Sequence, residues 1–265
     1  MERLYNARYS SNPMWTVFLT LTAIGFSINC PCLAAVDHTS NTRIAAKQQV
    51  NGLSLAHRWA LASTALLTEN NGHSHDLLWC TEATTTNIAT EKRMLYEWWG
   101  ITSRADLLET LSTLMSAGTR SSFEEMVKLA PDSAAVAKAK DALNPKERAE
   151  FEDRLKIVRE YGPKLGFKSL LGWDYARYIA LCRWGTLCSY LSQEEAWSKI
   201  MPAARLLQNS FSSWADLGEN YLIGRRFWLP QDKSNDNYKT IYSKLLSNPS
   251  SPWKTIPWST DLSQK

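Results

Sequence analysis

The sequence lacks the features by which several large classes of protein are recognised. Lys and Arg form no stripe or block, although the net charge is +4, so the clustered basic surface of a nucleic-acid-binding protein is missing. There is no CxxC pair and no Cys/His spacing typical of a zinc site. GxSxG, HExxH and P-loop motifs are also missing. The sequence therefore indicates no nucleic-acid partner and no cofactor, and it does not name a reaction.

Long apolar runs are scarce as well. The run from Met14 to Ile28 is uncharged, but it is shorter than the roughly 20 residues that a membrane-spanning helix requires. It follows a polar stretch that contains Arg3 and Arg8. Small residues come after it, and Cys32 to Ala34 fit the small-x-small pattern of a signal-peptidase site. This order of segments is typical of a secretory signal peptide.

We therefore predict that residues 1–34 are a cleaved signal peptide and that residues 35–265 are periplasmic or secreted. The alternative is an uncleaved N-terminal helix that anchors the protein in the inner membrane. The N-terminal segment is the only predicted contact with a membrane, because nothing later in the sequence resembles a span.

Cysteine is rare in the predicted mature chain. Only Cys80, Cys182 and Cys188 follow the signal peptide, so at least one thiol has no partner within a monomer. A disulfide between Cys182 and Cys188 is the candidate in an oxidising compartment. If one helix runs through both, however, their six-position spacing puts them on different faces.

Strand alternation is scarce, whereas apolar residues recur at helical spacing. Residues 53–67 and 102–118 each carry one apolar stripe, and Gly118 suits a C-terminal cap. Capping residues predict further helix starts: Ser103 with Asp106, Ser122 with Glu125, Asn144 with Pro145 and Glu147, Ser192 with Glu195, and Ser213. The fold class is therefore all-α, a single compact domain of many helices.

Prolines mark the expected interruptions. Pro202 predicts a kink or a break in the helix that follows Ser192. The prolines after Asn248 forbid a regular helix there, but Trp253 and Trp258 indicate that the tail packs onto the body. A soft domain boundary near residue 163 is the alternative to one domain.

Twelve tryptophans are many for 265 residues. Helical spacing brings Trp214, Tyr221 and Trp228 to one face, which favours a core stripe and leaves a ligand groove as the alternative. Arg225 projects near this face and can stack on Trp228 or Tyr221. Together with Arg226 it can also hold an anion.

The segment "GWDYARYIALCRW", residues 172–184, is apolar nearly all round, yet Asp174 and Arg177 lie within it. A buried charge needs a partner, and three positions along a helix let these two side chains meet. We predict a buried brace that includes Trp173, with Arg104 as a possible second partner of Asp174. The alternative is a carboxylate base with an orienting arginine in a cleft.

The loop "GHSHD" holds His73, His75 and Asp76. Two imidazoles and a carboxylate can share a metal ion. A solvated loop without metal is the favoured interpretation.

Two stretches carry a family resemblance. They are "WWGITSRADLLETLSTLMSAGTRSSFEEM", residues 98–126, and the segment from "GWDYARY" to "LIGRRFW", residues 172–228. Their motifs, in this order, resemble the YbeU/YbeR-like bacterial family, a domain of unknown function, over about residues 50–230. The resemblance implies a helical bacterial protein and supplies no activity. Members of the family are often placed in the cytoplasm, and the signal peptide predicted here departs from that.

The leading hypothesis is an exported helical protein that acts by binding another protein in the cell envelope. It depends on the helical body, the mixed surface charge and the missing catalytic motifs. One alternative is an envelope hydrolase with a site around Asp174 and Arg177. Another is a membrane-anchored scaffold that retains its N-terminal helix.

Overall fold

The computed structural model describes residues 52–263, so the predicted signal peptide, residues 1–34, lies outside the described residues. This part of the chain is built from helices without any strand, which confirms the predicted all-α class. The first half contains α2 (Leu55–Ala62), α3 (Ala65–Asn70), α4 (Thr85–Trp99), α5 (Arg104–Ser116), α6 (Gly118–Leu129) and α7 (Ser133–Asp141). The second half contains α8 (Pro145–Leu165), η2 (Gly166–Lys168), α9 (Leu171–Leu187), α10 (Gln193–Ser210), α11 (Trp214–Trp228), α12 (Ser234–Ser247) and α13 (Pro252–Thr255).

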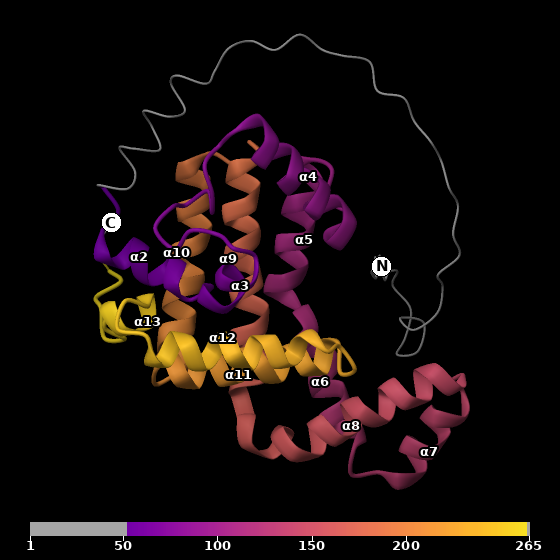
Figure 1. Ribbon diagram of the computed structural model, residues 1–265. Helices are drawn as coiled ribbons and strands as arrows, with labels where there is room; N and C mark the ends of the chain where they lie inside the picture. Colours follow the sequence, from indigo (N-terminus) through magenta and orange to yellow (C-terminus); the bar gives the residue numbers. More distant parts are fainter. Residues whose placement is uncertain (1–51, 264–265) are drawn as a thin grey trace, which may run out of the picture.

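Helix α9 forms the centre of the fold. Every residue of α9 after Leu171 is buried, as its apolar composition predicts. Helices α10, α11 and α5 make its main contacts. In Figure 1, α5, α9 and α10 stand side by side, while α11 and α12 cross near their lower ends and α7 and α8 extend to one side. The charged residues of α9 therefore face neighbouring helices and not solvent.

Most of the predicted helix starts are confirmed. Complete capping boxes open α5 at Ser103, α8 at Asn144 and α10 at Ser192. Ser213 caps α11 by accepting a hydrogen bond from the Asp216 amide at 3.1 Å. These caps were predictable because each needs only residues within one helical turn.

The start predicted at Ser122 is wrong, because α6 begins at Gly118 and contains Ser122 in its interior. The predicted helix 53–67 is divided into α2 and α3. Ser63 and Thr64 lie at the division, where their hydroxyls donate to the carbonyls of Ala60 and Leu61. Hydroxyls that bond the local backbone compete with helix continuation.

Pro202 lies inside a continuous α10, so the predicted break is absent. Pro202 has no N–H to donate to the carbonyl of Ser198. Both residues are exposed, so water can hydrate that carbonyl. Pro163 likewise lies inside α8. Helix α4 was not predicted, because its first turn carries two threonines, which are weak helix formers.

The C-terminal tail packs onto the body through indole hydrogen bonds. The Trp253 indole donates to the Ala62 carbonyl at 2.9 Å. The Trp59 indole donates to the Trp258 carbonyl at 3.0 Å, and that of Trp214 to the Ile256 carbonyl at 2.9 Å. This confirms the predicted packing of the tail, although Pro252 opens the short helix α13 there. Between residues 52 and 263, no helix has the length and apolar character needed to cross a membrane.

Candidate functional site

Asp174 serves as the N-terminal cap of a neighbouring helix. Its carboxylate is 0% exposed and accepts hydrogen bonds from the backbone amides of Thr119 at 2.9 Å and Arg120 at 3.0 Å. These are the first free amides of α6, which has no capping side chain of its own at Ala117. A carboxylate at this position is stabilising because it satisfies unpaired amides at the positive end of a helix.

Arg120 completes the same arrangement. Its guanidinium donates to Asp174 at 3.1 Å. It also donates to the carbonyls of Leu114 at 2.7 Å and Met115 at 2.5 Å, in the last turn of α5. Asp174 and Arg120 thus satisfy the end of α5 and the start of α6 together, which assigns Asp174 a structural role at this junction.

The guanidinium of Arg177, the predicted partner of Asp174, lies among three indole rings. It is 4.5 Å from the ring centre of Trp173, 4.8 Å from that of Trp99 and 5.8 Å from that of Trp228. Such contacts stabilise a cation by the negative face of each ring. Arg177 still acts on Asp174 through its charge. Burial raises the pKa of Asp174, and Arg177, Arg120 and the two amides oppose that rise.

Arg104 does not reach Asp174, so the expectation that it is a second partner of this carboxylate is wrong. It lies in the first turn of α5, whereas Asp174 contacts the segment after the last turn. A helix of this length spans about 20 Å. Arg104 instead forms a two-bond ion pair with Glu195 at 2.6 and 3.0 Å, and both side chains are exposed.

The aromatic stripe of α11 is largely core. Trp214 and Tyr221 are buried, and Trp228 is partly exposed. Arg225 is buried and donates to Asp232 at 2.6 Å, so an anion would have to displace that carboxylate. The Arg225 guanidinium lies 5.8 Å from the ring centre of Trp228, as predicted. It lies closer to Tyr238, at 4.4 Å.

Arg183 fastens the other end of α9. It is 1% exposed and donates to the hydroxyls of Thr64 and Thr68 at 2.8 and 2.9 Å. It also donates to the carbonyls of Ser74 and Leu77 at 2.6 and 2.9 Å. The three charged residues of α9 thus hold three different parts of the chain. These acceptors were not predictable, because no sequence motif marks the loop carbonyls of Ser74 and Leu77.

The three candidate metal ligands do not converge. His73 pairs with Glu91 at 3.5 Å, His75 with Glu69 at 3.0 Å, and Asp76 lies 3.7 Å from Arg58. Among residues 52–263, no three His, Cys, Asp or Glu side chains are placed to hold a metal ion. The separate partners explain how this loop is held without a shared ion.

His73 belongs to a thiol–imidazole–carboxylate cluster that was not predicted. Burial lowers its pKa, but contacts with Cys80 and Glu91 outweigh burial and raise it to about 9. The indole ring of Trp184 also packs edge-on against its ring, with the ring centres 6.4 Å apart. The available signal was the placement of His73 and Cys80 in one loop before α4.

The residue types of this cluster are those of an activated cysteine. Cys80, however, is 1% exposed and has a backbone φ of 65°. A buried thiol is inert toward substrates in solution. The cluster is therefore better explained as a clasp that holds the loop before α4 against α4 and α9.

The candidate disulfide is not formed. Cys182 and Cys188 are buried free thiols, because α9 runs through Cys182 and on to Leu187 and turns the two side chains to different faces. Burial raises the pKa of each thiol to about 12. Neither residue is suited to metal binding or nucleophilic attack in this state.

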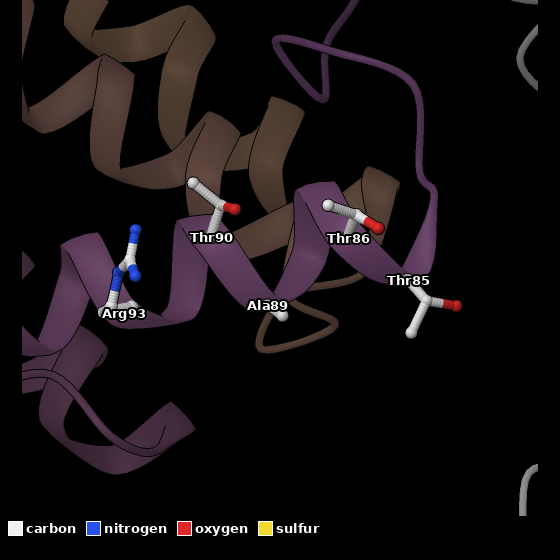
Figure 2. Close-up of a pocket in the computed structure, with 5 residues that line it drawn as sticks. All are labelled: Thr85, Thr86, Ala89, Thr90 and Arg93. Atoms are coloured by element: carbon white, nitrogen blue, oxygen red, sulfur yellow. The ribbon is translucent and has the colours of Figure 1, made fainter.

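The surface of the described residues includes the following two hollows. The first, of about 510 Å³, is lined by Thr85, Thr86, Ala89, Thr90 and Arg93 of α4. Figure 2 shows these five side chains on one helix. The second, of about 260 Å³, lies between α8, α11 and α12. Neither includes Asp174 or Arg177.

The chain was compared with known proteins. Residues 94–258 match a family described as "Protein of unknown function (DUF1266)". The uncharacterized protein YbeR of Escherichia coli (strain K12) is 24% identical over 190 residues, which covers 60% of this chain and 73% of YbeR. No solved structure matches the chain. The matched segment includes α9 and both helices that Asp174 joins, and it extends over more than half of the chain. The protein therefore belongs to the DUF1266 family, whose function is unknown.

Proposed function

We propose that this protein acts by binding another protein through α4. The observation that carries the proposal is the exposure of a large aromatic side chain near the end of this helix. Tyr96 is 60% exposed. Aromatic residues supply much of the binding energy at protein interfaces.

The rest of the outward face of α4 suits a helical partner. We define the α4 surface as the exposed residues Thr85, Thr86, Ala89, Thr90, Arg93 and Tyr96. Its first half carries small side chains, as Figure 2 shows, and small side chains let a second helix approach closely. The expected partner is an amphipathic helix that lays its apolar face on Ala89 and Tyr96.

Catalysis by Asp174 has less support. A general base must come within hydrogen-bonding reach of its substrate, and the carboxylate of Asp174 is fully enclosed by Thr119 and Arg120. The geometry thus favours binding over an envelope hydrolase with its site around Asp174 and Arg177.

The sequence of residues 1–34 is the basis for the compartment in which we propose that the protein acts. Their signal-peptide pattern supports a periplasmic or secreted protein, with an inner-membrane anchor as the alternative. Mass spectrometry of the protein from envelope fractions would identify its first residue. A chain that begins near residue 35 supports cleavage, whereas an intact Met1 in those fractions supports the anchor.

Site-specific photo-crosslinking in cells tests the binding surface. A photoreactive residue at Ala89 should give one defined adduct with a partner protein. The matched control is Ala137, another exposed alanine, on α7, where no such adduct is expected. Tyr96→Ala should weaken the adduct while the thermal midpoint stays unchanged. Equal labelling at both alanines, or no adduct at Ala89, would reject the α4 surface as the interface.

A further inference from the structure

The second hollow separates opposite charges along one groove. It lies between α8, α11 and α12, with a volume of about 260 Å³, where these helices meet in the lower part of Figure 1. Helix α11 places Glu219 at one end and Arg226 at the other, with Leu222 and Ile223 between them. Seven residues of helix correspond to about 10.5 Å.

Arg226 is available to a ligand in a way that its neighbour is not. Arg225 is paired with Asp232. Arg226 instead contacts the hydroxyl of Tyr161, which also contacts Glu160, and it forms no ion pair within the described part of the chain. A guanidinium suits a carboxylate, because its N–H groups can donate to both carboxylate oxygens.

Glu219 offers the complementary charge. It is exposed and accepts a hydrogen bond from the Tyr242 hydroxyl at 3.3 Å. The nearby cation Lys239 is engaged by Asp236 at 3.0 Å. The carboxylate of Glu219 can therefore accept hydrogen bonds from an ammonium group at this end of the groove.

We propose that this groove binds a short peptide of two or three residues with both termini free. The peptide ammonium lies at Glu219, and its carboxylate lies at Arg226. Small apolar side chains lie on Leu222 and Ile223. An extended tripeptide spans at most about 10 to 11 Å, which matches the separation of the two charged positions. This site is separate from the α4 surface and does not depend on it.

Calorimetric titration with trialanine tests the proposal. The purified protein should bind trialanine, and N-acetylation or C-amidation of the peptide should each weaken binding at least tenfold. Free alanine is too short to reach both charges and should bind more weakly than trialanine. No binding of trialanine, or equal binding of the blocked peptides, would overturn the proposal.

Variants assign each end of the peptide. Arg226→Gln should weaken trialanine binding and remove the difference between the acid and its amide. Glu219→Gln should remove the difference between the free and the acetylated amine. Arg148→Gln, an exposed change elsewhere on α8, should leave all affinities unchanged. If Arg226→Gln weakened acid and amide equally, the carboxylate assignment would be rejected.

A third variant separates the groove from other surfaces. Leu222 is partly exposed in the floor, and Leu222→Trp should fill the hollow and abolish trialanine binding. Thermal unfolding of each variant shows whether it is folded as the wild type is. Retained binding by a folded Leu222→Trp protein would place any peptide site elsewhere.

Discussion

The carboxylate of Asp174 occupies the space that a Cβ atom at residue 118 would need. A Cβ built on Gly118 would lie 2.2 Å from Oδ2 of Asp174. Gly118 also has a φ of +61°, in the left-handed region that glycine adopts most easily. Two independent constraints thus require glycine where α5 ends and α6 begins, and one of them comes from a helix more than 50 residues later in the chain.

Gly118→Ala should destabilise the protein by about 3 kcal/mol or more. The new methyl group adds a left-handed backbone penalty of about 1–2 kcal/mol and displaces the carboxylate that caps α6. Urea denaturation monitored by circular dichroism measures the change in the free energy of unfolding.

Gly72→Ala is the matched control for this prediction. Gly72 has nearly the same φ, +65°, but no atom lies within 4 Å of its built Cβ. The decrease in unfolding free energy of Gly72→Ala should therefore be the backbone penalty alone, about 1–2 kcal/mol. Equal losses in the two variants would mean that contact with Asp174 adds nothing.

The ion pair of Asp174 and Arg120 should show strong coupling in a double-mutant cycle. Asp174→Asn should destabilise the protein by about 3–5 kcal/mol, because it leaves the largely buried Arg120 without its counter-charge. Arg120→Met should be destabilising alone, and less so in the Asp174→Asn background. Unfolding free energies of the four proteins give the coupling, expected at about 1–3 kcal/mol.

The exposed pair of Arg104 and Glu195 provides the comparison. It has short, two-bond geometry, yet exposed pairs are worth less than about 1 kcal/mol. A cycle with Arg104→Met and Glu195→Gln should give coupling in that range. Similar coupling in the two cycles would contradict the role assigned to burial at Asp174.

The same junction explains why one helix start escaped prediction. Caps at Ser103, Asn144 and Ser192 could be read from the sequence because donor and acceptor lie within one turn. The cap of α6 could not, because the carboxylate belongs to α9. A local pattern at Ser122 therefore led to an N-cap five residues after the observed one at Ala117.

The site shows a similar limit. The burial of residues 172–184 follows from composition, since a helix without a polar face has to be surrounded. The partners of its charges do not follow. Spacing alone paired Asp174 with Arg177, but tertiary packing brings Trp99 and Trp228 around Arg177 and Arg120 to Asp174.

The three cysteines of the described chain should be unreactive in the folded protein. Cys80, Cys182 and Cys188 are buried free thiols, and burial raises the pKa of the last two to about 12, so little thiolate forms near neutral pH. Iodoacetamide followed by peptide mass spectrometry should find all three unmodified until denaturant is added. A Cys182–Cys188 cross-linked peptide from unreduced protein would contradict this structure.

His73 should make stability fall as the pH rises from about 6.5 to 9. Its pKa is raised from 6.5 to about 9 in the folded state, so the folded protein holds this proton more tightly than the unfolded chain does. The resulting stabilisation is complete below pH 6.5 and is lost as the pH passes the folded value. His73→Gln should therefore reduce the fall in unfolding free energy across this window, by about 2 kcal/mol after allowance for solvent screening.

His75→Gln is the control. Burial lowers the pKa of His75 below 6.5, so any change in stability caused by its titration falls below the pH window of His73. Curves for wild type and His73→Gln that stay parallel between pH 6.5 and 9.5 would show that the clasp with Glu91 and Cys80 does not hold a proton.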